Sequence, residues 1–141
     1  MPDIQNLFHI NAPIEKVYTA IATINGLRNW WTPETNGDEN IGGTLQFRFG
    51  SYGGPDLIVK ELTPNKLVAW SCINGVEEWK GTKLSFTLDR NNDKTRIRFT
   101  HANWKNDGDF FAACSFTWGR YMESLRQYCE TGKGKPFGSK D

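Results

Sequence analysis

The sequence predicts an α+β fold in which a six- to seven-stranded antiparallel sheet packs against one long carboxy-terminal helix. Through most of residues 41–101, apolar side chains recur at every second position, which is typical of strands with one buried face. The links between these strands are too short for parallel crossovers, so the strands run antiparallel. Within residues 109–131 the apolar spacing changes to steps of three and four, which indicates a helix.

The amino-terminal part predicts one strand and then two short helices. Residues 4–10 alternate in polarity and form the strand. Asn11 is a candidate helix cap, and residues 14–21 carry an apolar stripe at helical spacing. A second short helix over residues 27–31 ends before Pro33, because proline disfavours helical geometry in the residue that precedes it.

Five further strands follow, separated by a glycine-rich turn, a Pro-Asn turn and a polar hairpin. Their predicted ranges are 41–50, 56–62, 66–73, 84–88 and 97–101. The segment 74–83 has two interpretations. Asn74 and Gly75 form a tight hairpin turn, or the whole segment is a loop over the sheet edge.

The long helix over residues 109–131 has Asp109 as a candidate cap and Gly132 as a residue able to end it. Its first half is apolar almost all round and its second half carries charges on one side. We therefore expect the first half to be deeply covered and the second half to be half covered. The Gly- and Lys-rich residues 133–141 predict a mobile tail, which leaves residues 1–132 as a single domain.

Composition narrows the possible partners and the location. A net charge of +1, with basic and acidic residues intermixed, predicts neither a nucleic-acid partner nor a membrane partner. The sequence has no signal-peptide pattern and no apolar run long enough to span a bilayer. The three cysteines show no CxxC spacing, which favours reduced thiols in a cytoplasmic protein.

The usual motifs for nucleotide binding, serine hydrolysis and zinc proteolysis are absent from the sequence, and its His and Cys residues indicate no metal cluster, so we expect no metal and no cofactor. His101 is a weak catalytic candidate, because strand parity points it inward. It either bonds to backbone or water at a strand end, or serves as a polar anchor or proton-transfer group. The sequence therefore favours a binding protein, and an enzyme that uses His101 stays the alternative.

A cavity between sheet and helix would be lined by the inward-facing side chains of both. The candidate ligand-binding residues are Trp30, Trp31, Phe47, Phe49, Trp70, Phe86, Phe99, His101, Phe111, Cys114 and Trp118. The same residues could instead form a closed core, because close packing is the rule in protein interiors. Glu77, Glu78 and Trp79 are candidates for acids and a lid near this opening, although a solvated loop is favoured for the two glutamates.

Five segments carry a wider pattern: APIEKVYTAI before the Trp pair, IGGTLQFRF, GGPDLIVKELTPNKLVAWS, LSFTLDRNNDKTRIRFTH and WGRYMESLRQYCETGK. With the order of elements, they make the chain resemble a START-like helix-grip domain of the SRPBCC superfamily. Within that superfamily it resembles bacterial homologues of the activator of the ninety-kilodalton heat-shock protein ATPase. The resemblance covers nearly the whole chain. It implies a sheet curved around the long helix, with an elongated cavity between them for lipids or other apolar molecules.

Three functions follow from the residues and the resemblance together. The first is binding of a small hydrophobic or amphipathic molecule without covalent chemistry. The second is a cyclase- or hydrolase-type enzyme that uses His101. The third is contact with a chaperone, which the family name suggests, and a homodimer is a further candidate assembly. Fold-level similarity alone does not select among them.

Overall fold

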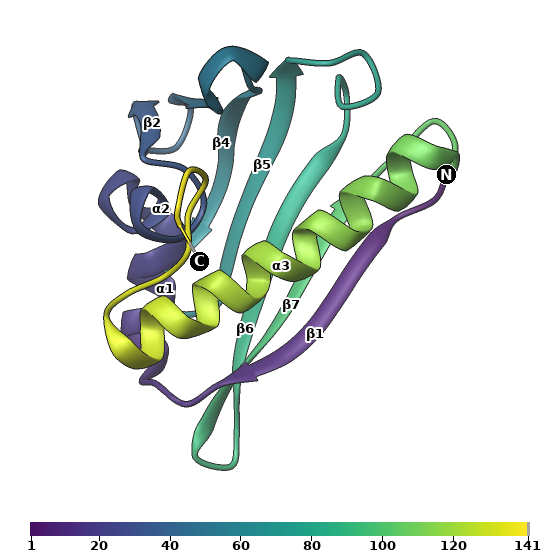
Figure 1. The fold of residues 1–141 in the computed structure, drawn as a ribbon. Coiled ribbons are helices and arrows are strands. Elements are labelled where there is room, and N and C mark those ends of the chain that lie inside the picture. The colour runs from purple at the N-terminus through teal and green to yellow at the C-terminus, as the bar shows by residue number, and fades with distance from the viewer. Residues whose placement is uncertain (141) are drawn as a thin grey trace.

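In the computed structural model, which describes residues 1–140, seven strands form one antiparallel sheet in the order β1-β7-β6-β5-β4-β3-β2. The strands are β1 (Ile4–Ile10), β2 (Glu34–Gly37), β3 (Thr44–Arg48), β4 (Asp56–Thr63), β5 (Leu67–Asn74), β6 (Lys83–Asn91) and β7 (Lys94–Ala102). The helices are α1 (Ile14–Ala22), α2 (Ile24–Trp30), the short 3-10 helix η1 (Gly50–Tyr52) and α3 (Asp109–Thr131). The sheet curves around α3, which crosses its concave face diagonally (Figure 1). This confirms the predicted α+β helix-grip fold.

The predicted two-residue alternation sets the core. Phe86 of β6 lies opposite Phe99 of β7 and Val68 of β5, and all three side chains are fully buried. On the other parity of β1, Leu7 is exposed. Each strand therefore gives alternate side chains to the interior between sheet and helices.

α2 begins earlier than its predicted range because Thr23 caps it. The Thr23 hydroxyl accepts a hydrogen bond from the backbone N–H of Gly26 at 3.0 Å. A Cβ at Gly26 would lie 2.5 Å from the carbonyl oxygen of Ala20, so α1 and α2 approach closely only because this residue is glycine. The Trp30 indole donates to the same Ala20 oxygen at 2.8 Å.

The structure resolves two points that the sequence did not decide: the strand β2 and the segment between β5 and β6. β2 was not among the individually predicted strands, because its sequence ETNG has no apolar alternation and only Thr35 is buried. The segment between β5 and β6 is a loop of consecutive turns, in which the backbone N–H of Trp79 donates to Val76 O at 3.0 Å. The loop interpretation of this segment is therefore correct.

α3 has the predicted bounds, and Gly132 ends it in the left-handed conformation with φ of 84°. Burial along the first half of the helix is lower than expected. Phe116 in this half is 71% exposed, whereas Met122 and Leu125 in the second half are buried. The deep cover expected for the first half was wrong, because only one side of it faces the interior, and the half cover expected for the second half is confirmed. No helix within residues 1–140 is long and apolar enough to cross a membrane.

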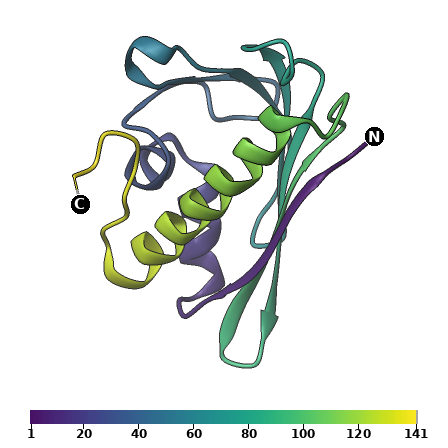
Figure 2. The same cartoon turned by 45° about the vertical axis from the view of Figure 1, so that its right-hand side comes forward.

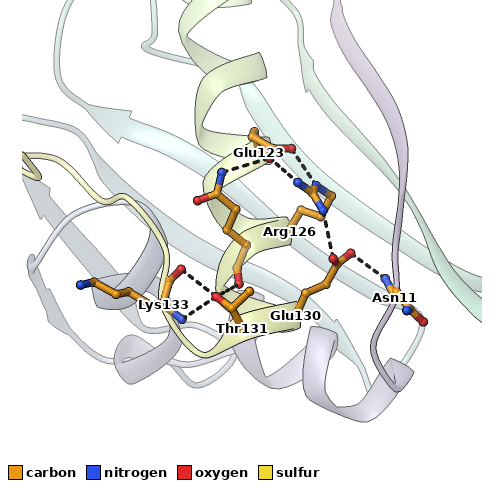
Figure 3. Close-up of polar contacts among 7 residues, drawn as sticks. Asn11, Glu123, Arg126, Glu130, Thr131 and Lys133 are labelled. Carbon is orange, nitrogen blue, oxygen red and sulfur yellow. Dashed lines mark hydrogen bonds and ion pairs between the residues drawn. The ribbon is translucent and has the colours of Figure 1, made fainter. Parts of the chain in front are cut away.

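An ionic network ties the end of α3 to the start of the chain (Figure 3). Arg126 donates to the carboxylates of Glu123 and Glu130, and Glu130 accepts the backbone N–H of Asn11 at 2.9 Å. Asn11 does not cap α1, because Pro13 occupies the N-cap position of that helix, without a side-chain hydrogen bond.

The tail, for which the sequence predicts mobility, is held against the molecule in the structure. The backbone N–H of Lys135 donates to the Ser124 hydroxyl, and that of Phe137 donates to Trp31 O, both at 2.7 Å. Figure 1 shows residues 132–140 folding back beside α2. A Gly- and Lys-rich composition does not reveal this anchoring, because it depends on backbone donors and on the Phe137 ring, which packs against Phe49.

Candidate functional site

An open pocket of about 500 Å³ lies where two loops face the amino-terminal half of α3. One loop contributes Phe49 and residues 52–55, and the other contributes residues 75, 76 and 79. Both loops and the start of α3 lie at the same end of the sheet (Figure 2). α3 supplies one wall through Phe110, Cys114, Thr117, Trp118 and Tyr121, and Trp31 completes the lining.

The lining is apolar, and no charged side chain of residues 1–140 belongs to it. Burial keeps two of its polar groups, Cys114 and Tyr121, neutral near pH 7. Burial raises the pKa of the Cys114 thiol, and the neighbouring Trp79 indole only partly offsets this. Burial also raises the pKa of Tyr121, against the opposing influence of the Arg120 charge. A pocket of this kind suits an apolar ligand body.

Arg48 fixes the first of the two loops. Its guanidinium donates to Phe47 O at 2.9 Å and to Gly54 O at 3.3 Å, and pairs with Asp56 at 2.9 Å. These contacts hold the turn that presents residues 52–55 to the pocket.

Only four of the predicted ligand-binding residues lie around this pocket: Trp31, Phe49, Cys114 and Trp118. Six others are buried in the interior away from it: Trp30, Phe47, Trp70, Phe86, Phe99 and His101. Phe111 is half-buried against Trp104, with ring centroids 5.3 Å apart. The sequence left open whether these residues line a cavity or form a closed core. The structure contains a packed middle and a pocket at one end.

The sequence analysis missed several residues of the pocket wall. On α3, the positions 110, 114, 117 and 121 recur at steps of four, three and four, beside the stripe used to predict the helix. This second stripe was a readable signal. The contributions of Tyr52 and Val76 were not readable, because they depend on how two loops fold over the sheet edge.

His101 lies outside the pocket in a box of indole rings. The Trp118 indole N–H donates to His101 Nδ1 at 3.1 Å, so this nitrogen is the acceptor. The proton therefore resides on Nε2, which donates to the Thr82 hydroxyl at 2.8 Å, and Thr82 donates onward to Trp79 O at 2.6 Å. Trp79 and Trp104 pack their rings against the imidazole at 4.5 and 4.8 Å between centroids.

This arrangement holds His101 in its neutral form. Burial lowers its pKa from 6.5 to about 3, and a second ring proton would point at the Trp118 N–H. Both nitrogens are occupied by protein groups, which leaves neither free to exchange a proton with a ligand in the pocket. Within residues 1–140, no three His, Cys, Asp or Glu side chains are grouped as metal ligands.

Comparison with known proteins identifies the family of the chain. The model of the Activator of Hsp90 ATPase homolog 1-like protein family matches residues 11–130. The chain belongs to this family. It is also similar to the Aha1 of Colwellia psychrerythraea, solved in solution as a dimer, with 41% identity. That match covers 95% of this chain and 100% of the other, with a TM-score of 0.86.

More distant solved structures share the fold. A protein from Staphylococcus saprophyticus has 17% identity and a TM-score of 0.77, over 94% of this chain and 95% of the other. CalU16 from Micromonospora echinospora has 18% identity and a TM-score of 0.78, over 93% of this chain and 67% of the other. No curated protein sequence matches the chain. At these identities the two structures support the helix-grip architecture alone.

Proposed function

We propose that this protein binds a small hydrophobic or amphipathic molecule in the pocket between α3 and the two loops, without covalent chemistry. The observation that carries the proposal is the pocket of about 500 Å³, which is lined by aromatic rings and by no charged side chain of the described residues. Its contact with solvent is the entry route for a ligand.

The state of His101 supports binding over catalysis. A general acid or base needs a proton that it can exchange with the ligand. His101 is fully buried and bonded at both nitrogens. The pocket wall itself offers only a thiol and hydroxyl groups, with the pKa values of Cys114 and Tyr121 raised by burial.

The test is a titration with N-phenylnaphthylamine, an uncharged fluorescent apolar probe. Wild-type protein should bind it, and Thr117→Trp should weaken binding at least tenfold, because the new ring fills space in the pocket. Thr87→Trp makes the same exchange at an exposed position of β6 and should bind like wild type. Binding that is absent in wild type, or equal in both variants, would refute the proposal.

We also propose that two copies of the chain associate. Two observations support this: the similar Aha1 is a dimer, and the first half of α3 exposes Phe116 beside the small residues Ala112 and Ala113. Small neighbours let a second helix approach closely around one large ring. Contact with a chaperone remains a prediction that rests on the family's description alone.

A further inference from the structure

A second hollow adjoins the pocket and differs from it in charge. It is a groove of about 730 Å³ between the outer side of α3 and residues 135–139 of the tail. Thr117 and Tyr121 line both the groove and the apolar pocket. A molecule lying across these two side chains would therefore have one end in each hollow.

The groove holds two cations whose charges are not neutralised by partners. Arg120 comes from α3 and Lys135 from the tail, and neither forms an ion pair with any residue from 1 to 140. Arg120 lies close enough to Tyr121 to oppose the rise in the pKa of that phenol. This places the positive charge of Arg120 beside the wall that the two hollows share.

Among residues 1–140, Glu123 is the one carboxylate on the groove, and it does not neutralise these cations. Glu123 accepts two hydrogen bonds from Arg126, at 2.7 and 2.5 Å, and a third from Gln127 at 3.0 Å. These bonds, with Lys135 as a lesser contributor, lower the pKa of Glu123 to about 2. The carboxylate of Glu123 is thus paired with side chains of α3 itself. Among the described residues, the groove therefore keeps an excess of positive charge.

The tail is fastened so that Lys135 stays on the groove. The backbone N–H of Lys135 donates to the Ser124 hydroxyl, which in turn donates to Trp30 O at 2.8 Å. A Cβ at Gly134 would lie 2.6 Å from Asn29 O, so a glycine is needed for the tail to pass this point. The backbone is therefore held at Lys135 and again at Phe137, and this places Lys135 on the groove.

We infer that the ligand is an amphipathic anion, with its apolar body in the pocket and a carboxylate or phosphate head on Arg120 and Lys135. The inference rests on the proposed function and adds the charge of the head group. An uncharged pocket that opens beside two unpaired cations matches a molecule with one apolar end and one anionic end.

The experiment compares three probes that share a ten-carbon chain: decanoate, decanol and decyltrimethylammonium. Each displaces N-phenylnaphthylamine at neutral pH and low salt. We expect decanoate to bind wild type about fivefold more tightly than decanol, since two partly exposed ionic contacts are worth about that much. Decyltrimethylammonium should bind most weakly, and the advantage of decanoate should shrink as salt is added.

The variant Arg120→Gln/Lys135→Gln should bind decanoate and decanol equally. Lys60→Gln/Arg98→Gln removes the same two charge types from exposed strand positions and should keep the fivefold difference. Equal affinities for decanoate and decanol in wild type, or a preference for the cation, would overturn the inference and leave the apolar pocket standing. Failure of all three probes, with no binding of the dye, would overturn the proposed function as well.

Discussion

At the scale of single residues, His101 makes stability depend on pH. Its pKa is 6.5 when unfolded and about 3 in the fold, so below pH 6.5 the unfolded chain binds a proton that the folded chain does not. Stability is therefore lost as pH falls from 6.5 toward 3, by up to about 1.4 kcal/mol per pH unit. Between pH 7.5 and 5, wild type should lose about 2 kcal/mol more than His101→Gln.

Urea unfolding at the two pH values measures this difference. His9→Gln removes an exposed histidine of β1 and should behave like wild type. If wild type and His101→Gln lost the same free energy of unfolding, then His101 would not be held neutral by burial and by hydrogen bonds at both ring nitrogens.

Trp118 is the second residue whose role can be tested by itself. It is 3% exposed and packs on Trp31 and Phe99. Its indole N–H donates to His101 Nδ1, which leaves the imidazole proton on Nε2. Trp118→Ala should cost about 3–5 kcal/mol of unfolding free energy, as for a large core side chain. Tyr52→Ala, at an 86% exposed position, should cost less than about 1 kcal/mol. A fully stable Trp118→Ala protein would mean that this ring only lines the pocket.

At the scale of elements, two glycines within helices should respond in opposite directions to alanine. A Cβ at Gly119 meets no atom within 4 Å, so Gly119→Ala should stabilise the protein by about 1 kcal/mol through helix propensity. A Cβ at Gly26 would lie 2.5 Å from Ala20 O, so Gly26→Ala should force α1 and α2 apart and cost about 1–3 kcal/mol. Thermal unfolding would show the two shifts. The same sign for both would contradict the helix packing.

The elements also show what a sequence can predict. The bounds of α3 and the parity of the strands are local properties, and both were predicted correctly. The burial of α3 is not local. Phe116 on its apolar first half is exposed because no segment of residues 1–140 folds over that side, and α2 and the tail cover one side of its charged second half. For the same reason only the α3 wall of the pocket had a readable pattern, whereas the loop walls depend on tertiary contacts.

At the scale of the whole molecule, self-association should be visible in the mass. Light scattering should give twice the chain mass of 16.1 kDa, and Phe116→Ser should shift the protein toward the monomer. Leu7→Ser removes another exposed apolar side chain, on β1, and should leave the mass unchanged. A wild-type protein of single-chain mass at high concentration would contradict the proposed dimer.

The six tryptophans form one connected chain of rings. Trp31 lies within 6.3 Å of Trp30, Trp70 and Trp118, and Trp79 links Trp118 to Trp104, all as distances between ring centroids. At such spacings, excitation absorbed by any indole passes to its neighbours before it is emitted. Since Trp31, Trp79 and Trp118 line the pocket, a bound molecule that accepts indole excitation, such as N-phenylnaphthylamine, would quench light gathered by all six rings. The protein thus carries its own optical reporter of pocket occupancy.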